Sequence, residues 1–154
     1  MPRSIAKADR ANRETLLEFL RPRHQAVLMT TRSDGRPQAS PVTCGLTEDG
    51  RIVVSTYPDR AKARNARRDP RVTVCVLSDG FSDPWVQVDG AATVLDMPAA
   101  EDGLVEYYRC ISGEHPDWDE YRQAMREQDK TLISVEIDRW GPLATGGFPA
   151  RLAD

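Results

Sequence analysis

The sequence predicts a mainly β (α+β) single domain over residues 1–154, built as a six-stranded antiparallel barrel with flanking helices. Three observations support this fold class. The 154-residue chain has the length of one domain. Two Asp-Gly turns, at Ser33–Gly35 and Glu48–Gly50, join consecutive apolar segments in the manner of hairpins. Six short strands with few helices favour an antiparallel sheet that closes on itself.

The first half of the chain reads as a helix followed by an antiparallel meander. Leucines recur at helical spacing over about residues 8–20, in a helix that Ala11 or Asn12 could begin and that Pro22 ends. Three strands are then predicted, at residues 25–32, 35–47 and 51–56. The second strand contains Pro37 and Pro41, which favour a sheet edge or a bulge where main chain faces a ligand.

The second half supplies the remaining three strands and two helices. The strands are predicted over residues 71–80, 85–96 and 131–140. The helices are predicted from Pro98 to near Gly113 and from Pro116 or Asp117 to about residue 129. The apolar run of the strand at 71–80 predicts burial on both of its faces. Gly90 marks a place where a barrel strand can bend. The glycine- and proline-bearing tail, residues 141–154, could reach the functional site.

Composition excludes several classes of protein. The formal net charge of −3 provides no global field that would gather nucleic acid. No long apolar run could span a membrane, and the first residues lack the apolar core of a secretion signal. The three cysteines are widely spaced and form no CxxC pair, which predicts reduced thiols and no metal site. We therefore expect a cytoplasmic protein that binds neither nucleic acid nor a membrane.

A basic segment stands out in this mildly acidic chain. Between residues 60 and 71 it holds six cations and one carboxylate, and the cations are Arg60, Lys62, Arg64, Arg67, Arg68 and Arg71. A short helix over residues 59–68 would end at Asp69, because the residue before a proline avoids helical geometry. Helical spacing then separates Arg60 and Lys62, in the first turn, from Arg64, Arg67 and Arg68, which we interpret as a solvated face.

The first turn of this helix is suited to an anion. Free main-chain N–H groups and the positive end of the helix dipole favour negative charge there. Arg60 adds a bidentate donor and Lys62 adds a point charge, so together they predict a phosphate site. The alternative is a basic surface helix that keeps the protein soluble, and the charge pattern alone favours that alternative.

Several segments resemble one family in the same order along the chain. They are the opening helix, AVLMTTRSDGRPQASPV, RAKARNARRDPRVTV after IVVST, WVQVDGAATV and SGEHPDWDEYRQAM, and together they cover about residues 10–138. This sequence resembles the split-barrel flavin and deazaflavin oxidoreductases, the pyridoxamine 5′-phosphate oxidase-like superfamily. The pairing of RAKARNARRDPR with GEHPDWDEYRQAM is most similar to the actinobacterial branch that uses the deazaflavin coenzyme F-420.

The resemblance implies a homodimer of FMN-binding-type split barrels with two cofactor sites at the subunit interface. By that resemblance Arg60 and Lys62 hold the cofactor phosphate, and Asn65 supports the same loop. Ser55 and Thr56, at the end of the preceding strand, approach the phosphate or the ribityl chain. The implied residues beside the ring and over the pocket are Gln38, Ser40 and Pro41 on the second strand, and Trp85 or Phe81 from the partner subunit.

Other interpretations of these side chains stay open. Ser40 and Ser55 are equally expected as ordinary strand hydroxyls, and Trp85 as part of a dimer core. The helical spacing of Trp118, Tyr121 and Met125 predicts core packing. Tyr107 and Tyr108 could place one ring in a substrate cleft. Neither His24 nor His115 has metal partners at ligand spacing, and nothing near Cys44 would activate its thiol.

The resemblance implies an oxidoreductase in which the reduced deazaflavin transfers hydride to a small conjugated or electron-poor substrate. The cofactor carries the chemistry, so no catalytic residue is predicted. Arg36, Arg64 and Arg67 could meet the polyglutamate tail of the deazaflavin. The alternatives are an FMN enzyme of the pyridoxamine-phosphate-oxidase type, from which the tail RWGPLATGGFPARLAD departs, and a non-enzymatic cofactor- or haem-binding split barrel. Haem would require an axial histidine or cysteine.

Overall fold

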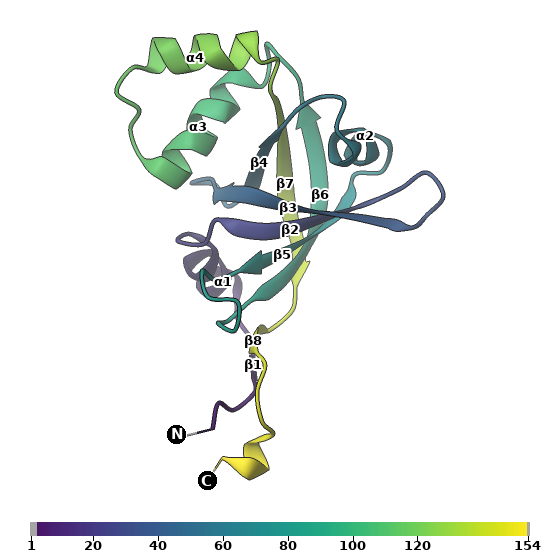
Figure 1. The fold of residues 1–154 in the computed structure, drawn as a ribbon, viewed down its shortest axis with the longest axis vertical. Helices are drawn as coiled ribbons and strands as arrows, with labels where there is room; N and C mark the ends of the chain where they lie inside the picture. The colour runs from purple at the N-terminus through teal and green to yellow at the C-terminus, as the bar shows by residue number, and fades with distance from the viewer. Residues whose placement is uncertain (1–2, 154) are drawn as a thin grey trace.

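The computed structural model describes residues 3–153 and shows an antiparallel barrel that closes in the order β2-β3-β4-β7-β6-β5 (Figure 1). The six strands are β2 (Gln25–Thr31), β3 (Pro37–Leu46), β4 (Ile52–Thr56), β5 (Arg71–Leu77), β6 (Val86–Leu95) and β7 (Thr131–Trp140). Each neighbouring pair is antiparallel. The predicted fold class is therefore confirmed.

The two predicted hairpins are present. Gly35 (φ 87°) and Gly50 (φ 83°) take the left-handed conformation at the two Asp-Gly turns, where glycine carries no steric penalty. Strand β3 pairs with β2 over its length from Pro37 to Thr43, but it pairs with β4 only from Cys44 to Leu46. The first part of β3 is consequently a one-sided edge, as its prolines predicted.

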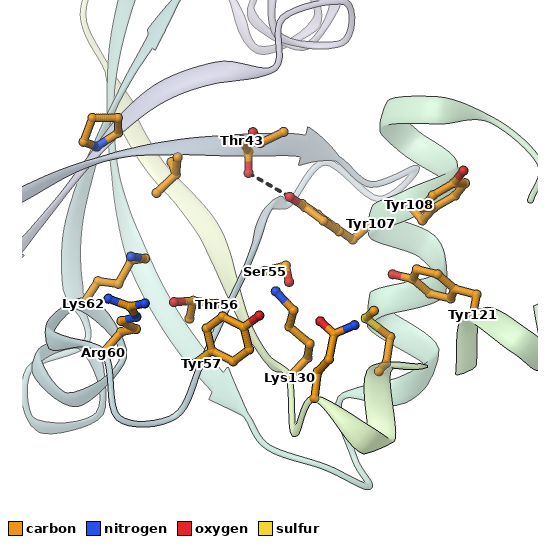
Figure 2. A pocket seen from close by; sticks show the side chains of 14 residues that line it. Thr43, Ser55, Thr56, Tyr57, Arg60, Lys62, Tyr107, Tyr108, Tyr121 and Lys130 are labelled. Carbon is orange, nitrogen blue, oxygen red and sulfur yellow. Dashed lines mark hydrogen bonds between the residues drawn. The ribbon is translucent and has the colours of Figure 1, made fainter. Parts of the chain in front are cut away.

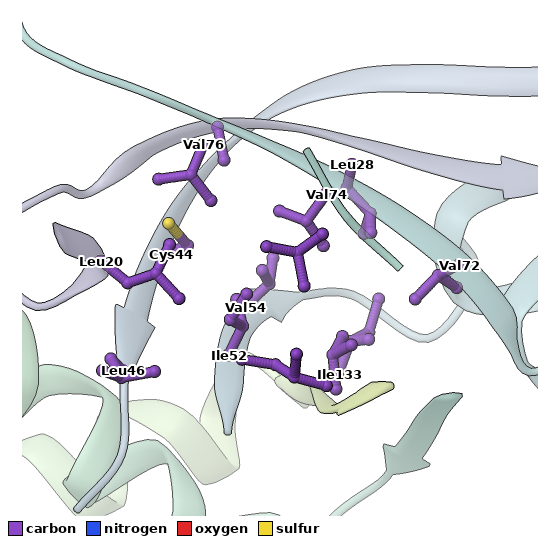
Figure 3. Close-up of a cluster of buried hydrophobic side chains, with 14 of the residues drawn as sticks. Leu20, Leu28, Cys44, Leu46, Ile52, Val54, Val72, Val74, Val76 and Ile133 are labelled. Carbon is purple, nitrogen blue, oxygen red and sulfur yellow. The ribbon is translucent and has the colours of Figure 1, made fainter. Parts of the chain in front are cut away.

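The barrel interior is apolar and almost fully enclosed (Figure 3). Its fully buried side chains include Leu28, Val54, Val74, Val88, Ile133 and Val135. The β5 side chains alternate between buried and half-buried, so the prediction that both faces of this strand are buried is wrong. In a barrel only the inward face of a strand meets the core, and no helix covers the outward face of β5 completely. The three cysteines are unpaired, as expected, and Cys44 is buried.

The N-terminal helix is shorter than predicted. Helix α1 spans Arg13–Leu20, and the Asn12 side chain caps it by accepting a hydrogen bond of 2.8 Å from the Thr15 N–H. The preceding residues form strand β1 (Lys7–Asp9), which pairs with β8 (Leu143–Thr145) from the tail. Pairing between the two ends of the chain decides the conformation of residues 7–9, and local spacing does not reveal it.

The β1–β8 ribbon and the short helix η1 (Ala150–Leu152) lie beyond one end of the barrel (Figure 1). Strand β6 shifts register between Asp89 and Gly90, in agreement with the bend expected at this glycine. A Cβ at Gly90 would lie 2.3 Å from the Glu136 carbonyl oxygen. Within residues 3–153 no helix is long and apolar enough to cross a membrane.

Three further helices lie around the other end of the barrel. Helix α2 (Ala61–Arg68) joins β4 to β5 and buries Ala63 and Ala66. Helices α3 (Glu101–Ser112) and α4 (Trp118–Glu127) join β6 to β7. The Asp117 side chain caps α4, as its position predicted. Figure 1 shows α2 on one side of β3 and β4, with α3 and α4 on the other.

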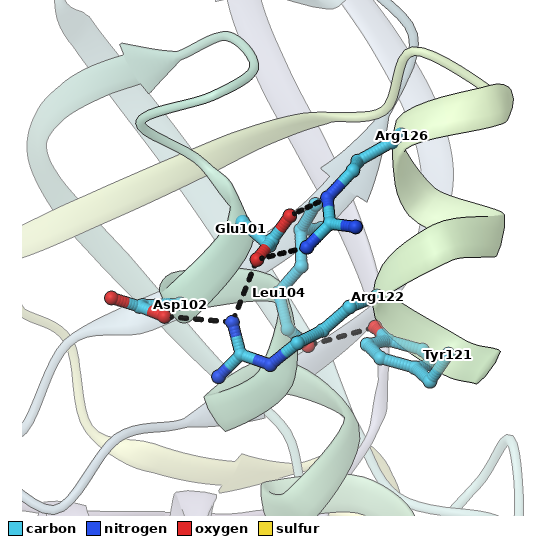
Figure 4. Close-up of polar contacts among 6 residues, drawn as sticks. All are labelled: Glu101, Asp102, Leu104, Tyr121, Arg122 and Arg126. Carbon is cyan, nitrogen blue, oxygen red and sulfur yellow. Dashed lines mark hydrogen bonds and ion pairs between the residues drawn. The ribbon is translucent and has the colours of Figure 1, made fainter. Parts of the chain in front are cut away.

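Ion pairs attach α4 to α3. Glu101 accepts hydrogen bonds from both Arg122 (2.8 Å) and Arg126, and the Tyr121 hydroxyl donates to the Leu104 carbonyl at 2.8 Å (Figure 4). No residue of α4 is fully buried. The position of α4 therefore depends on these polar contacts as well as on apolar packing, and this matters because α4 forms one wall of the site described next.

Candidate functional site

A cavity of about 500 Å³ lies between α2 on one side and α3 and α4 on the other (Figure 2). Its floor is formed by β3 and β4, through Pro41, Thr43, Ser55 and Thr56. The edge portion of β3 thus borders the cavity, and Pro41 lies within it. No aspartate, glutamate, histidine or cysteine of residues 3–153 lines the cavity.

The α2 end of the cavity is cationic. Arg60 is the N-cap residue of α2 and Lys62 lies in its first turn, and both side chains line the cavity. Neither forms an ion pair with a carboxylate in the described part of the chain. No side chain caps the helix. The Ala63 N–H donates to the Arg60 carbonyl at 3.1 Å, whereas the N–H groups of Ala61 and Lys62 have no acceptor within residues 3–153 and remain available to an anion.

The surroundings of Lys62 disfavour its positive charge. Burial lowers the pKa of the Lys62 ammonium, and the neighbouring positive charge of Arg60 lowers it further. A bound anion would relieve both effects, because it supplies opposite charge to a partly desolvated ammonium. This end of the cavity therefore combines positive charge and a helix start, and no carboxylate among residues 3–153 pairs with its cations, which is the environment that suits an anion.

A third cation lies between the two ends of the cavity. Lys130 connects α4 to β7, and its ammonium nitrogen is 4.0 Å from the centroid of the Tyr57 ring (Figure 2). Sequence reasoning did not identify Lys130 or Tyr57 as site residues. The signal available was weak: Tyr57 directly follows Thr56, and Lys130 directly precedes the last strand.

Tyrosines form the opposite end. The hydroxyl of Tyr107 donates to the Thr43 carbonyl at 3.2 Å, and that of Tyr121 donates to a main-chain carbonyl of α3. Burial raises the pKa of both phenols, that of Tyr121 to about 12. Tyr108 also lines the cavity and contacts the Tyr121 ring at a centroid distance of 5.1 Å. Tyr107 and Tyr121 are therefore neutral near pH 7, and their hydrogen bonds and packing hold the rings in place.

The prediction that Trp118, Tyr121 and Met125 pack as core is wrong in part. Tyr121 and Met125 pack against a small buried cluster but remain half-exposed, and both line the cavity. Trp118 does not line the cavity, and its ring centroid lies 5.7 Å from those of Tyr108 and Tyr121. Helical spacing identified the apolar face of α4 but could not show that this face borders a cavity.

Among the site residues predicted from the sequence, the structure brings one group to the cavity and leaves another beneath it. The cavity-lining group is Arg60, Lys62, Ser55, Thr56 and Pro41. Gln38, Ser40 and Asn65 instead form part of a hydrogen-bonded chain. Asn65 Nδ2 donates to Thr30 Oγ1 at 3.1 Å, Thr30 Oγ1 donates to Gln38 Oε1 at 3.0 Å, and Gln38 Nε2 donates to Ser40 Oγ at 3.4 Å. This chain ties α2 to β2 and β3.

Trp85 and Phe81 lie away from the cavity of their own chain. Trp85 is 39% exposed and borders a separate groove of about 350 Å³ with Trp140 and Pro142. Its main chain pairs with Ala144 of β8. Phe81 is exposed, and no residue of the tail lines the cavity within residues 3–153. A role for Trp85 in closing a partner's cavity stays a prediction.

The remaining basic residues of α2 differ from one another. Arg64 is exposed and forms no ion pair within the described chain, as a solvated residue should. Arg67 instead binds Asp96 at 2.5 and 2.8 Å. Arg68 donates to the Thr31 carbonyl and to the Asn65 side chain, both at 2.9 Å. Arg67 and Arg68 are exposed, as predicted, and in addition both attach α2 to neighbouring segments through these hydrogen bonds.

The described lining residues offer cations at a helix start and aromatic surface, and no histidine, cysteine or carboxylate among residues 3–153 lines the cavity to activate a hydroxyl such as that of Ser55. Burial raises the pKa of the Cys44 thiol to about 12, so this side chain is an inert thiol. His24 lies with Nδ1 2.9 Å from the Cys44 carbonyl oxygen, outside the cavity. His115 Nδ1 accepts a hydrogen bond from the Asp117 N–H. Chemistry at this cavity would therefore require a bound group that reacts, which the residues orient and enclose.

Comparisons with known proteins agree with this picture. The sequence profile of the pyridoxamine 5′-phosphate oxidase family matches residues 13–144. An F-420H(2)-dependent biliverdin reductase of Mycobacterium tuberculosis is 27% identical over 124 residues, which cover 80% of this chain and 82% of that protein. A conserved hypothetical protein from the same organism has a similar structure, with a TM-score of 0.72 at 19% identity over 91% of this chain and 89% of the other. A solved F-420 reductase has a TM-score of 0.59 at 20% identity, over 80% of this chain and 94% of that one.

Proposed function

The chain belongs to the pyridoxamine 5′-phosphate oxidase family, and from this premise we propose that it is an oxidoreductase that uses the deazaflavin coenzyme F-420. The observation that carries the proposal is the cavity, in which Arg60 and Lys62 meet at an uncapped helix start and which no carboxylate of residues 3–153 lines. The proposed substrate is a small conjugated or electron-poor organic molecule, reduced by hydride from the coenzyme.

The residues present fit such a cofactor. Arg60 and Lys62 would hold its phosphate, with the α2 N–H groups adding donors. Ser55 and Thr56 offer hydroxyls to a polyol chain next to that phosphate. The one-sided edge of β3 at Pro41 offers unpaired main-chain groups to a polar heterocycle. When bound, the coenzyme would supply the hydride that a protein side chain cannot provide.

In this proposal the residues of the chain bind the cofactor, orient it and exclude water from the reacting centre. Its half-buried tyrosines form an apolar wall that shields a reacting centre from solvent. The Tyr107 and Tyr121 hydroxyls donate to main-chain carbonyls, so they hold the wall in place. The hydrogen bonds that join Asn65, Thr30 and Gln38 fix α2 relative to β3. They thereby fix Arg60 and Lys62, which we call the phosphate grip, relative to the edge of β3. In this proposal Asn65 supports the site without touching the cofactor.

The choice of F-420 over FMN rests on the 27% identical relative, which uses the reduced deazaflavin. Both coenzymes carry a phosphate, so Arg60 and Lys62 do not discriminate between them. A haem-binding split barrel is less well supported, because neither histidine nor any of the three cysteines lines the cavity. We further propose a cytoplasmic homodimer in which Trp85 of one subunit lies near the cavity of the other.

The proposal is tested by titrating the purified protein with F-420 and with FMN, side by side, and following binding by calorimetry and by the visible absorbance of each coenzyme. We expect F-420 to bind at least about tenfold more tightly than FMN, a difference of about 1.4 kcal/mol. If FMN binds more tightly than F-420, the cofactor of the proposed function is FMN and not F-420. A protein that binds neither coenzyme, or that binds haem in their place, would refute the proposed function.

A further inference from the structure

The position of the Lys130 side chain in the cavity is not explained by a role in the phosphate grip. Its main chain is held at the exit of α4: the Lys130 N–H donates to the Met125 carbonyl at 3.1 Å, and the preceding Asp129 takes a left-handed conformation with φ 51°. Such a conformation in a residue with a side chain is uncommon and is tolerated best by Asp and Asn. The turn directs the Lys130 side chain into the cavity, beside Tyr57 (Figure 2).

The Lys130 ammonium forms no ion pair within residues 3–153, and its nitrogen lies 4.0 Å from the centroid of the Tyr57 ring. On α3 the Glu101 carboxylate is engaged elsewhere, since it binds Arg122 and Arg126 (Figure 4). This arrangement differs from that of Arg67, whose charge Asp96 compensates. A half-buried ammonium beside a ring face is ready to accept an anionic ligand as a further partner.

The wall next to Lys130 favours flat aromatic ligands. Tyr107, Tyr108 and Tyr121 line it, and Met125 adds a thioether. Because two of the hydroxyls are bonded to main-chain carbonyls, these side chains offer mainly ring surface to the cavity. Aromatic rings pack on such surfaces in edge-to-face or offset geometry, and methionine sulfur adds to the attraction.

From this juxtaposition we infer that Lys130 and the tyrosine wall form a binding site for a planar conjugated acid, distinct from the phosphate grip of Arg60 and Lys62. The inference rests on the proposed function, in which this end of the cavity receives the substrate. A neutral planar ligand would leave the ammonium without opposite charge. An aliphatic acid would leave the tyrosine faces without an aromatic partner. The site therefore selects for the combination of a flat ring system and a carboxylate.

The test uses the full chain without cofactor and 2-naphthoate as the probe, with binding followed by titration calorimetry. The neutral isostere 2-naphthamide and the aliphatic cyclohexanecarboxylate are the comparison ligands. We expect 2-naphthoate to bind more tightly than either. Lys130→Met keeps the length of the side chain but removes its charge, and should weaken 2-naphthoate by about tenfold or more. Lys130→Arg should restore most of the affinity, which a purely structural role of Lys130 would not produce.

Two further arms keep this site separate from the phosphate grip. Lys62→Met should lower the affinity for F-420 and should weaken 2-naphthoate less than Lys130→Met does, because Lys62 lies at the α2 end of the cavity and Lys130 lies nearer the tyrosines (Figure 2). The inference is overturned if Lys130→Met leaves 2-naphthoate binding unchanged, or if Lys62→Met removes it. If F-420 binds but 2-naphthoate does not, the inference fails and the proposed function stands. If neither binds, both fail.

Discussion

Replacing Lys62 by alanine should weaken cofactor binding without weakening the fold. Lys62 supplies one charge-assisted contact to a phosphate, and such a contact contributes about 1.5–3 kcal/mol. The dissociation constant of F-420 should therefore rise about 10- to 150-fold. Arg60→Ala should act in the same direction, nearer the lower limit because Arg60 is exposed. Arg64→Ala is the matched control on the same helix, since Arg64 is exposed and does not line the cavity.

The pKa of Lys62 adds two expectations of definite sign. Burial and the charge of Arg60 hold this pKa below 10.5 in the free protein, and a bound phosphate would raise it again. Affinity should therefore be complete below the lowered pKa and should fall as the pH rises through it. A lowered lysine pKa also means that the charged ammonium opposes folding below that pKa. Lys62→Ala should consequently unfold at the same temperature as the wild type, or higher.

Calorimetric titration with F-420 and thermal unfolding of the same samples provide the measurement. Loss of affinity together with a lower unfolding temperature would mean that Lys62 acts through the fold. Equal and small losses in the variants of Arg60, Lys62 and Arg64 would refute the phosphate grip and restore the solvated-helix interpretation. An alkaline decline in affinity that persists in Lys62→Ala would show that another group titrates.

Three other substitutions test the surroundings of the site. Asn65→Ala leaves Thr30 without its donor and should lower the free energy of unfolding in urea by about 1–3 kcal/mol, with a smaller effect on F-420 affinity than Lys62→Ala. Asp96→Asn tests a carboxyl whose pKa the Arg67 hydrogen bond lowers from 3.8 to about 2. The stabilisation that the Asp96 carboxylate provides is present above pH 3.8 and is lost as the pH falls towards 2. In a plot of the urea midpoint against pH, Asp96→Asn should therefore decline less steeply in this acid range than the wild type. Gly90→Ala should destabilise by about 1–3 kcal/mol or alter the register of β6, because its Cβ would meet a carbonyl oxygen at 2.3 Å; an unchanged urea midpoint would show that the strand adjusts freely.

Local signals predicted the parts of this fold that depend on neighbouring residues. The Asp-Gly hairpins, the edge character of β3 at its prolines and the bend at Gly90 all follow from turn chemistry, missing N–H donors or missing side chains. The β1–β8 ribbon was missed because it pairs the two ends of the chain, which no local pattern records. Helix α3 begins at Glu101, three residues after Pro98, because residues 97–100 form a turn of their own.

The candidate site likewise contains residues that are close together in the sequence and residues that come from separate segments. Ser55, Thr56, Arg60 and Lys62 are near neighbours in the sequence, so one strand end and one helix start were enough to group them. Lys130, Tyr57 and Tyr107 come from separate segments and meet only because β7 lies beside β4 and α3 lies across β3 and β4. Asn65 is adjacent to the grip in sequence, yet the helix turns its side chain towards Thr30. Proximity in the sequence therefore grouped Arg60 and Lys62 of the proposed phosphate grip, but it could not predict which residues of other segments line the same cavity.

The electrostatics of the cavity follow from which charges are paired rather than from their sum. The net charge is −3, and many arginines in the described chain have carboxylate partners, namely Arg36, Arg51, Arg67, Arg71, Arg109, Arg122, Arg126 and Arg139. Arg60, Lys62 and Lys130 have none and line one cavity without acidic residues. Opposite charges within a few ångströms cancel at longer range, whereas unpaired charges in a partly desolvated cavity are weakly screened. An acidic protein can therefore hold a locally cationic cavity, and the net charge of the sequence does not reveal the sign of that local charge.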